Sequence, residues 1–307
     1  MRPEDTEDVS TVLVHGPWQH RFVSAHGARF HVAEAGEGPL VVLLHGFPQF
    51  WWAWRWQLCD LADAGYRAVA MDLRGYGASD KPPRGYDTAT SAADVAAVIR
   101  ALGESEAFVV GHGLGGRTAW AMPALTPRLV RGVAVLGAAH PLLWRSALLD
   151  LLRAGDAGRR ALAALAASQV PSLPERELVT GEGVQRVLTS WSAPGWPDEE
   201  TLQRYRSAMR VPFVAHSASE YHRWIVRSPL REEGRRFAAA LRRPVEVPVL
   251  QLHGRLDPTL GAETVWAASD LVAGPHRVQE IDGAGHFLPE EASEHVSAAL
   301  LSWLARW

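Results

Sequence analysis

The stretch that decides the fold is AFVVGHGLGGRTAW, residues 107–120. Its first four residues are apolar, as in a buried strand, and a helical pattern begins near residue 115. Four glycines lie in the turn between the two segments. Small residues suit a sharp strand-to-helix turn, because the backbone there is strained and the helix packs close to the strand. The spacing predicts a turn of this kind with Gly113 at its tip.

Outward from this turn, strands and helices alternate. Apolar runs at 40–44 and 66–71 predict buried strands, and another is expected at 130–136. Helical periodicity lies between them, over about 88–102 and 115–125. Residues 19–35 alternate around His26-Gly27, which indicates a hairpin before the first buried strand. The order predicts an α/β fold with a mostly parallel sheet and right-handed crossovers.

The alternation stops near residue 142. Leu/Ala/Arg-rich helical stretches broken by Pro/Gly loops extend to about 241, and strand patterns return at 247–254 and 276–281. A last helix places Val296, Leu300, Trp303 and Trp307 on one face. We therefore expect an α/β core formed by residues 1–141 and 242–307, interrupted by a helical cap at 142–241.

The amino-acid composition limits which kinds of binding partner can be expected. Among 307 residues, 31 Lys and Arg face 34 Asp and Glu, so the formal charge of −3 gives no sign of a nucleic-acid-binding or membrane-binding protein. A small-molecule substrate is expected, and a homodimer is left open. No apolar run reaches the ~20 residues of a membrane helix, and the charged start MRPEDTEDVS does not resemble a signal peptide, so a cytoplasmic location is expected. Cys59 is the single cysteine, which predicts no internal disulfide and no zinc site; no cofactor is expected.

Two polar residues downstream complete a catalytic pattern. Asp257 lies in HGRLDP after one predicted strand, and His286 lies in DGAGHF after a later one. The order of turn tip, acid and histidine is that of the catalytic triads built on a strand–turn–helix of this type. The sequence therefore predicts a catalytic site around Gly113, Asp257 and His286.

Six motifs in this order give the chain its family resemblance: HGFP at 45–48, DLRGYGASDKP at 72–82, GHGLGG at 111–116, AHP at 139–141, HGRLDP at 253–258 and GAGHF at 283–287. The chain resembles the α/β-hydrolases, and within them it is similar to epoxide hydrolases and haloacetate dehalogenases. The resemblance implies an α/β-hydrolase fold with a helical cap and a hydrolase activity.

The resemblance also implies roles for individual residues. In these enzymes an Asp at the turn tip attacks carbon and forms an ester, which water activated by a His–Asp pair then hydrolyses. His286 would be that base and Asp257 its orienting partner, and the backbone N–H groups of Phe47 and Leu114 would form the oxyanion hole. His45 and Asp72 are expected to be structural, with Asp72 bracing Arg74.

Position 113 departs from the family pattern because glycine has no side chain to attack with. Three hypotheses follow. His286 and Asp257 could activate water, or move a proton on a substrate, without a covalent step. The chain could instead be an inactive, ligand-binding relative, or a variant in which an aspartate was replaced. We favour an enzyme that acts on a small, largely apolar epoxide, ester, halide or activated carbonyl.

Further residues bear on the substrate. Arg117 matches the second of two arginines that grip the carboxylate in haloacetate dehalogenases, whereas Leu114 replaces the first. The segment SEYHRW, 219–224, resembles the tyrosine-bearing cap helix of epoxide hydrolases, but His222 stands where the tyrosine is usual. Candidate donors to a substrate oxygen are Tyr221, His222, Trp191 and Trp196. Trp51, in an aromatic cluster at 50–56, is a candidate for the pocket wall.

Overall fold

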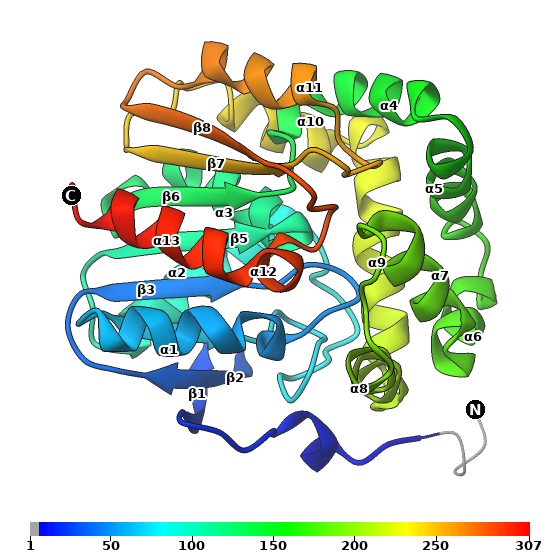
Figure 1. Ribbon diagram of the computed structural model, residues 1–307, viewed down its shortest axis with the longest axis horizontal. Coiled ribbons are helices and arrows are strands. Elements are labelled where there is room, and N and C mark those ends of the chain that lie inside the picture. Colours follow the sequence, from blue (N-terminus) through cyan, green and yellow to red (C-terminus); the bar gives the residue numbers. More distant parts are fainter. Residues whose placement is uncertain (1–5) are drawn as a thin grey trace.

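The computed structural model describes residues 6–307, apart from the side chain at position 157. An eight-stranded sheet forms its centre, in the order β1-β2-β4-β3-β5-β6-β7-β8 (Figure 1). β1 and β2 form the predicted hairpin, β2 is also antiparallel to β4, and all remaining pairs are parallel. The strands are β1 (Gln19–Ala25), β2 (Ala28–Ala35), β3 (Leu40–Leu44), β4 (Arg67–Met71), β5 (Ala107–His112), β6 (Val130–Leu136), β7 (Val249–Gly254) and β8 (His276–Ile281).

Helices cover both faces of the sheet. On one face α1 packs against α13, and on the other α2 packs against α3 (Figure 1). The central strands β3, β5 and β7 are buried along their whole length, as their continuous apolar runs predict. The helices outside the insertion are α1 (Arg55–Asp63), α2 (Thr88–Ala101), α3 (Gly113–Leu125), α11 (Ala262–Ala267), α12 (Leu288–Glu291) and α13 (Ser293–Leu304).

A run of helices separates β6 from β7 in the sequence and lies at the end of the sheet where the parallel strands finish (Figure 1). It matches the predicted helical insertion; the exact boundaries of a cap domain at 142 and 241 stay a prediction. The helices are α4 (Trp144–Arg153), α5 (Gly155–Ala167), α6 (Leu173–Thr180), α7 (Glu182–Trp191), α8 (Glu199–Arg210), α9 (Val214–Arg227) and α10 (Glu232–Ala240). No helix among residues 6–307 has the length and apolarity needed to cross a membrane.

Most predicted elements are confirmed within two residues. One detail of the last helix is wrong: Val296, Leu300 and Trp303 are buried, but Trp307 is exposed. α13 ends at Leu304, so Trp307 lies beyond the helix and does not extend its buried face.

The strand order fixes where a site can form. β3 connects to β4 on one side of the sheet, whereas β5 continues to β6 on the other, so the chain reverses its direction of winding between β3 and β5. Parallel α/β sheets place ligands outside the carboxyl ends of the strands at such a reversal. The loops after β3, β5 and β7 meet there, below the inserted helices.

Candidate active site

The predicted strand-to-helix turn is present after β5. β5 ends at His112, and α3 begins at Gly113, whose φ is +51°. The turn is tight: a Cβ added at Gly115 would lie 2.3 Å from the carbonyl oxygen of Leu44. This contact explains why small residues surround the tip. A Cβ at Gly113 would instead meet nothing closer than 3.4 Å, so it would be in ordinary van der Waals contact with His286 and Gly46 without overlapping them.

His286 and Asp257 form a buried pair beside this tip. His286 Nδ1 lies 2.8 Å from Asp257 Oδ2, and its Nε2 lies 3.4 Å from the position of a Cβ on Gly113. Nδ1 must carry a hydrogen, because a carboxylate only accepts. Nε2 has no hydrogen-bond partner in the described part of the chain and lies on the side of Gly113. The fold thus brings the three predicted residues together.

Asp257 is held as a carboxylate by its neighbours. Thr259 donates both its backbone N–H and its hydroxyl to Asp257 Oδ1, each at 2.7 Å. Burial works to raise the pKa of Asp257, but the charge and hydrogen bond of His286, together with the Thr259 donors, keep that pKa below its usual value. Sequence reasoning missed Thr259, although an Asp followed two residues later by Thr is a common turn pattern.

The loop that carries His286 is fixed from two directions. Its backbone N–H donates to the carbonyl of Trp191 at 2.8 Å, which ties the loop to the end of α7. Glu291 accepts the N–H groups of Gly285, Phe287 and Ala193 at 2.7 to 2.8 Å. Burial nevertheless raises the pKa of Glu291. Glu291 was not predicted from sequence; it links the histidine loop to the inserted helices.

The histidine that precedes the tip belongs to a second set of contacts. His112 Nδ1 lies 2.9 Å from Gln49 Oε1, and Nε2 lies 2.8 Å from the carbonyl oxygen of His286. Burial, followed by repulsion from His286, lowers the pKa of His112 to about 3, so it is neutral near pH 7. Neither His112 nor Gln49 was predicted as a site residue. They connect the loop after β3, the tip and the histidine loop.

The two residues predicted to supply an oxyanion hole lie next to the tip. Gly46, directly before Phe47, has its Cα 3.5 Å from the position of a Cβ on Gly113. Leu114 is the second residue of α3, so its N–H is among the donors that a helix leaves unpaired at its start. The arrangement is compatible with the predicted role, which stays a prediction.

An apolar cavity of about 270 Å³ adjoins the site. Phe47, Trp191 and His222 line it, and the Trp191 ring lies 5.4 Å from the His286 ring, between centroids. His222 also packs edge-on against Phe47 at 4.5 Å. The rest of the wall comes from the inserted helices, including Ala161, Ala164, Leu165, Pro174, Leu178 and Val187.

Four of the six predicted substrate residues do not line this cavity, namely Trp51, Arg117, Trp196 and Tyr221. Trp196 stacks on Phe287, with ring centroids 4.9 Å apart. The Tyr221 hydroxyl donates to the carbonyl of Arg74 at 3.1 Å and is fully buried. Trp51 is fully buried, and its indole N–H donates to the carbonyl of Val12 at 2.8 Å. The contacts of these three aromatic side chains are packing and structural hydrogen bonds.

Arg117 lies one helical turn after Gly113, on the same side of α3. Its guanidinium has no hydrogen bond or ion pair in the described part of the chain, and Nε is buried. Burial lowers the pKa of Arg117 to about 10. Burial and then the charge of Arg117 lower the pKa of His140 to about 4, and both also lower that of His222. Arg117 is therefore a partly buried cation, and no counter-ion lies beside it among residues 6–307.

The expected contact between Asp72 and Arg74 is wrong. Asp72 accepts hydrogen bonds from His31 and from the backbone N–H of Trp51, whereas Arg74 pairs with Asp94 at 2.6 and 2.7 Å. The reason is that Asp72 turns inward at the end of β4, away from its sequence neighbour. His45 is structural as expected: its Nε2 accepts the N–H of Leu73 at 3.1 Å.

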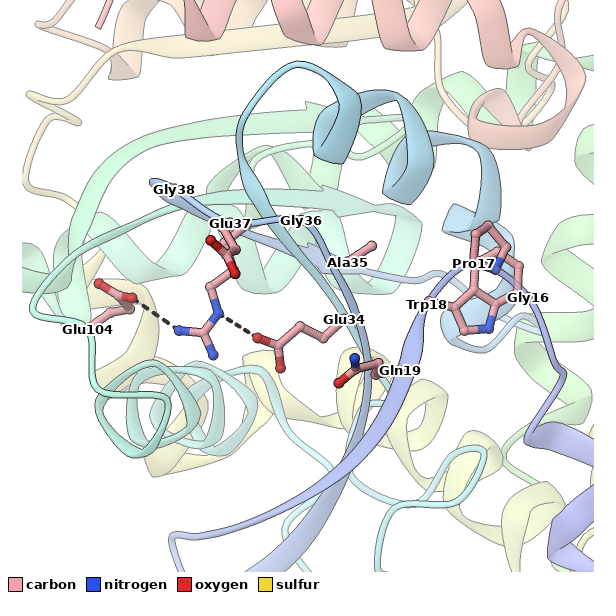
Figure 2. Close-up of a pocket in the computed structure, with 11 residues that line it drawn as sticks. Gly16, Pro17, Trp18, Gln19, Glu34, Ala35, Gly36, Glu37, Gly38 and Glu104 are labelled. Atoms are coloured by element: carbon pink, nitrogen blue, oxygen red, sulfur yellow. Dashed lines mark hydrogen bonds and ion pairs between the residues drawn. The ribbon is translucent and has the colours of Figure 1, made fainter.

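A second cavity, larger than the one beside Trp191, lies elsewhere. It measures about 650 Å³ and lies where β3 begins, at the edge of the sheet opposite the tip. Figure 2 shows its charged centre, where Arg67 bridges Glu34 and Glu104. No predicted site residue lines it. Within residues 6–307 no three His, Cys, Asp or Glu side chains are grouped to hold a metal ion.

Comparison with known proteins agrees with this geometry. The family model described as alpha/beta hydrolase fold matches residues 39–293. Epoxide hydrolase A of Mycobacterium tuberculosis is 30% identical over 92% of this chain and 96% of its own. Epoxide hydrolase 3 of Xenopus tropicalis is 30% identical over 96% of this chain and 79% of its own.

Solved structures give the same result. An epoxide hydrolase from an endophytic Streptomyces superposes with a TM-score of 0.80 at 28% identity, covering 95% of this chain and 96% of that one. Epoxide Hydrolase A from Mycobacterium thermoresistibile superposes with a TM-score of 0.79 at 27% identity, covering 94% and 98%. The chain therefore belongs to the α/β-hydrolase fold family and is an epoxide hydrolase-like hydrolase.

Proposed function

We propose that this protein hydrolyses a small, largely apolar substrate with water activated by His286 and Asp257, and without an enzyme-bound ester. The substrate carries an epoxide, an ester, a halide or an activated carbonyl. The observation that carries the proposal is the position of His286 Nε2, which lies beside the bare α-carbon of Gly113 without a hydrogen-bond partner among the described residues, while Nδ1 is held by Asp257.

The proton transfers follow from the hydrogen bonds. Because Nδ1 donates to Asp257, the lone pair of the neutral ring is on Nε2, which can accept a proton from water. The water oxygen then forms the bond to the electrophilic carbon as the bond to the leaving group breaks. The proton on Nε2 passes to the leaving oxygen, or is released to solvent when a halide leaves. Asp257 stabilises the imidazolium in between.

The bare tip gives this water a place. In relatives with an attacking side chain, the space between the tip and the histidine holds that side chain, whereas Gly113 leaves it free. The N–H groups of Phe47 and Leu114 would stabilise negative charge on the substrate oxygen. Hydrolysis then needs one chemical step instead of two.

The residues around the site indicate which class of substrate it would accept. The cavity beside His286 is mostly apolar, which suits a hydrocarbon body. Arg117 does not line that cavity, and Leu114 stands where the first of two carboxylate-binding arginines would be, so the proposal does not extend to a carboxylate substrate. His222, at the junction of Phe47 and the cavity, is the candidate donor to the substrate oxygen.

A second candidate function is ligand binding without turnover, and the missing side chain at position 113 is the observation that favours it. Assays against panels of epoxides, esters and halocarboxylates, with wild type and His286→Ala, separate the two. Turnover that collapses in His286→Ala supports the enzyme. Ligands that bind equally to both proteins, with no turnover by either, support the binding protein.

Gly113→Asp tests the third hypothesis, that an aspartate has been replaced. If the pocket still suits covalent chemistry, this variant accumulates an ester on the introduced carboxylate, which mass spectrometry detects after reaction with an epoxide or halocarboxylate. Absence of the ester, with turnover by wild type, means that the site is adapted to direct attack by water.

A further inference from the structure

The exposed face of α4 has an unusual composition. Four of its six exposed side chains are large and apolar: Trp144, Leu148, Leu149 and Leu152 are 37 to 62% exposed. The other two are arginines, Arg145 and Arg153. A surface helix of a globular protein normally turns its apolar residues inward, so α4 is inverted.

The inward side of α4 confirms the inversion. Its one acidic residue, Asp150, is buried and accepts the backbone N–H of Gly261 at 2.9 Å. This bond ties the helix to the loop before α11 and fixes which side faces out. The apolar face of α4 is therefore held outward by the fold.

From this face we infer a docking surface for an anionic lipid bilayer, on which α4 lies flat with its four apolar side chains inserted. Clustered apolar residues flanked by arginines, with no acidic residue among the exposed positions, are typical of helices that lie in the membrane interface. Arginine side chains reach the lipid phosphates, while tryptophan suits the boundary between hydrocarbon and headgroups.

Charge decides between a bilayer and a second copy of the chain. In a two-fold dimer through α4, the same face would meet itself, and Arg145 and Arg153 would oppose a second α4 helix, which exposes no acid of its own. An anionic bilayer complements both arginines. Arg153 also contacts Glu263 at 3.3 Å, but both side chains are more than 65% exposed and can separate. The whole-chain charge of −3 hides this local surface.

The position of α4 links membrane docking to the proposed active site. α4 is followed at once by α5 and packs against it at the outer edge of the inserted helices (Figure 1). α5 supplies Ala161, Ala164 and Leu165 to the wall of the apolar cavity beside His286. A bilayer bound at α4 would bring dissolved apolar substrate close to that cavity.

The test is sedimentation of the full chain with vesicles of phosphatidylcholine containing about one third phosphatidylglycerol, compared with phosphatidylcholine alone. We expect binding to the anionic vesicles that weakens as salt screens the charges. A variant with Leu148→Ser, Leu149→Ser and Leu152→Ser should bind at least about tenfold more weakly. Arg145→Gln and Arg153→Gln should each cost about fivefold.

Leu230→Ser is the matched control, because Leu230 is 84% exposed but lies outside α4. It should bind as wild type does, and all variants should keep the wild-type circular dichroism. Equal binding by the triple-serine variant and wild type, or no binding by wild type, overturns the inference. So does a dimer, measured by light scattering, that only the α4 variants lose. The readout needs no turnover, so it is independent of the proposed hydrolysis.

Discussion

Two buried Asp–His pairs in this molecule have nearly the same geometry and different surroundings. Asp257 and His286 are 2.8 Å apart, and so are Asp72 and His31. The difference lies at the far nitrogen of each ring. His286 Nε2 lies on the side of Gly113 and has no hydrogen-bond partner in the described part of the chain, whereas His31 Nε2 lies 2.9 Å from the Nδ1 of His20. An acid partner alone therefore does not make a histidine a catalytic base; a free second nitrogen beside a cavity is also needed.

The second pair has a further property that follows from counting hydrogens. His20 Nε2 lies against the carbonyl oxygen of Val14, and His31 Nδ1 lies against the carboxylate of Asp72. Both partners only accept, so both nitrogens carry hydrogens. One more hydrogen must lie between the two rings, which makes one ring an imidazolium. The two rings therefore share one positive charge, and the Asp72 carboxylate lies against the pair at His31.

The largest expected effect is on turnover, and it should differ between the two Asp–His pairs. His286→Ala should lower turnover by at least about 100-fold, because it removes the general base. His31→Ala should leave turnover per folded molecule within a few-fold of wild type, since His31 is fully buried and does not line the cavity. Steady-state rates, normalised to folded protein by circular dichroism, measure both. Equal loss in the two variants would contradict the distinction.

The next effect is on stability. Asp72→Asn should lower the free energy of unfolding by about 3 to 5 kcal/mol, because it leaves a buried imidazolium without its counter-charge. Asp72 also accepts the backbone N–H groups of Trp51 and Ala78, which join separate loops. Urea unfolding measures the change. A loss below about 1 kcal/mol would mean that the pair of rings carries no charge and that the hydrogen count above is wrong.

His140 is a buried histidine without an acid partner among the described residues, and it extends the comparison to the pH dependence of stability. The folded-state pKa of His140 is about 4, below the ordinary 6.5, because of burial and nearby Arg117. Between these values the unfolded chain binds the proton and the folded one does not, so stability falls as pH drops from 6.5 to 4. The slope is up to about 1.4 kcal/mol per pH unit. His140→Gln should reduce the slope by that amount in urea titrations; an unchanged slope would contradict it.

The smallest expected effect is at the tip. Gly113→Ala should lower the free energy of unfolding by about 1 kcal/mol, because φ is +51° there and an L-residue is strained in that region. The added Cβ itself has room, with 3.4 Å to the nearest atom. Urea unfolding checks the value. A loss of several kcal/mol would show that the space beside His286 is filled.

Much of this architecture could be predicted from the sequence, because a run of apolar residues as long as a strand indicates a buried strand. β6 and β8 match their predicted limits at 130–136 and 276–281. The turn tip, the acid and the histidine could also be predicted, since each follows a strand and parallel strands bring their carboxyl ends together.

Side-chain partners could not be predicted in the same way. The sequence suggests Arg74 as the neighbour that Asp72 braces, but Asp72 bonds His31, 41 residues away. Glu291 and Gln49 hold the site through contacts across long separations in sequence, and no local pattern reports them. Tyr221 and His222 are adjacent on α9, yet only His222 lines the cavity, because consecutive helical residues point about 100° apart.

The central claim is that water attacks the substrate directly, opposite a tip with no nucleophile. A single turnover in water enriched in oxygen-18, with enzyme in excess over a substrate found in the panels, tests it most directly. We predict that the product of that first turnover carries the label and that the protein mass is unchanged throughout. Unlabelled product, or a protein that gains the mass of the substrate or of oxygen-18, would contradict the account.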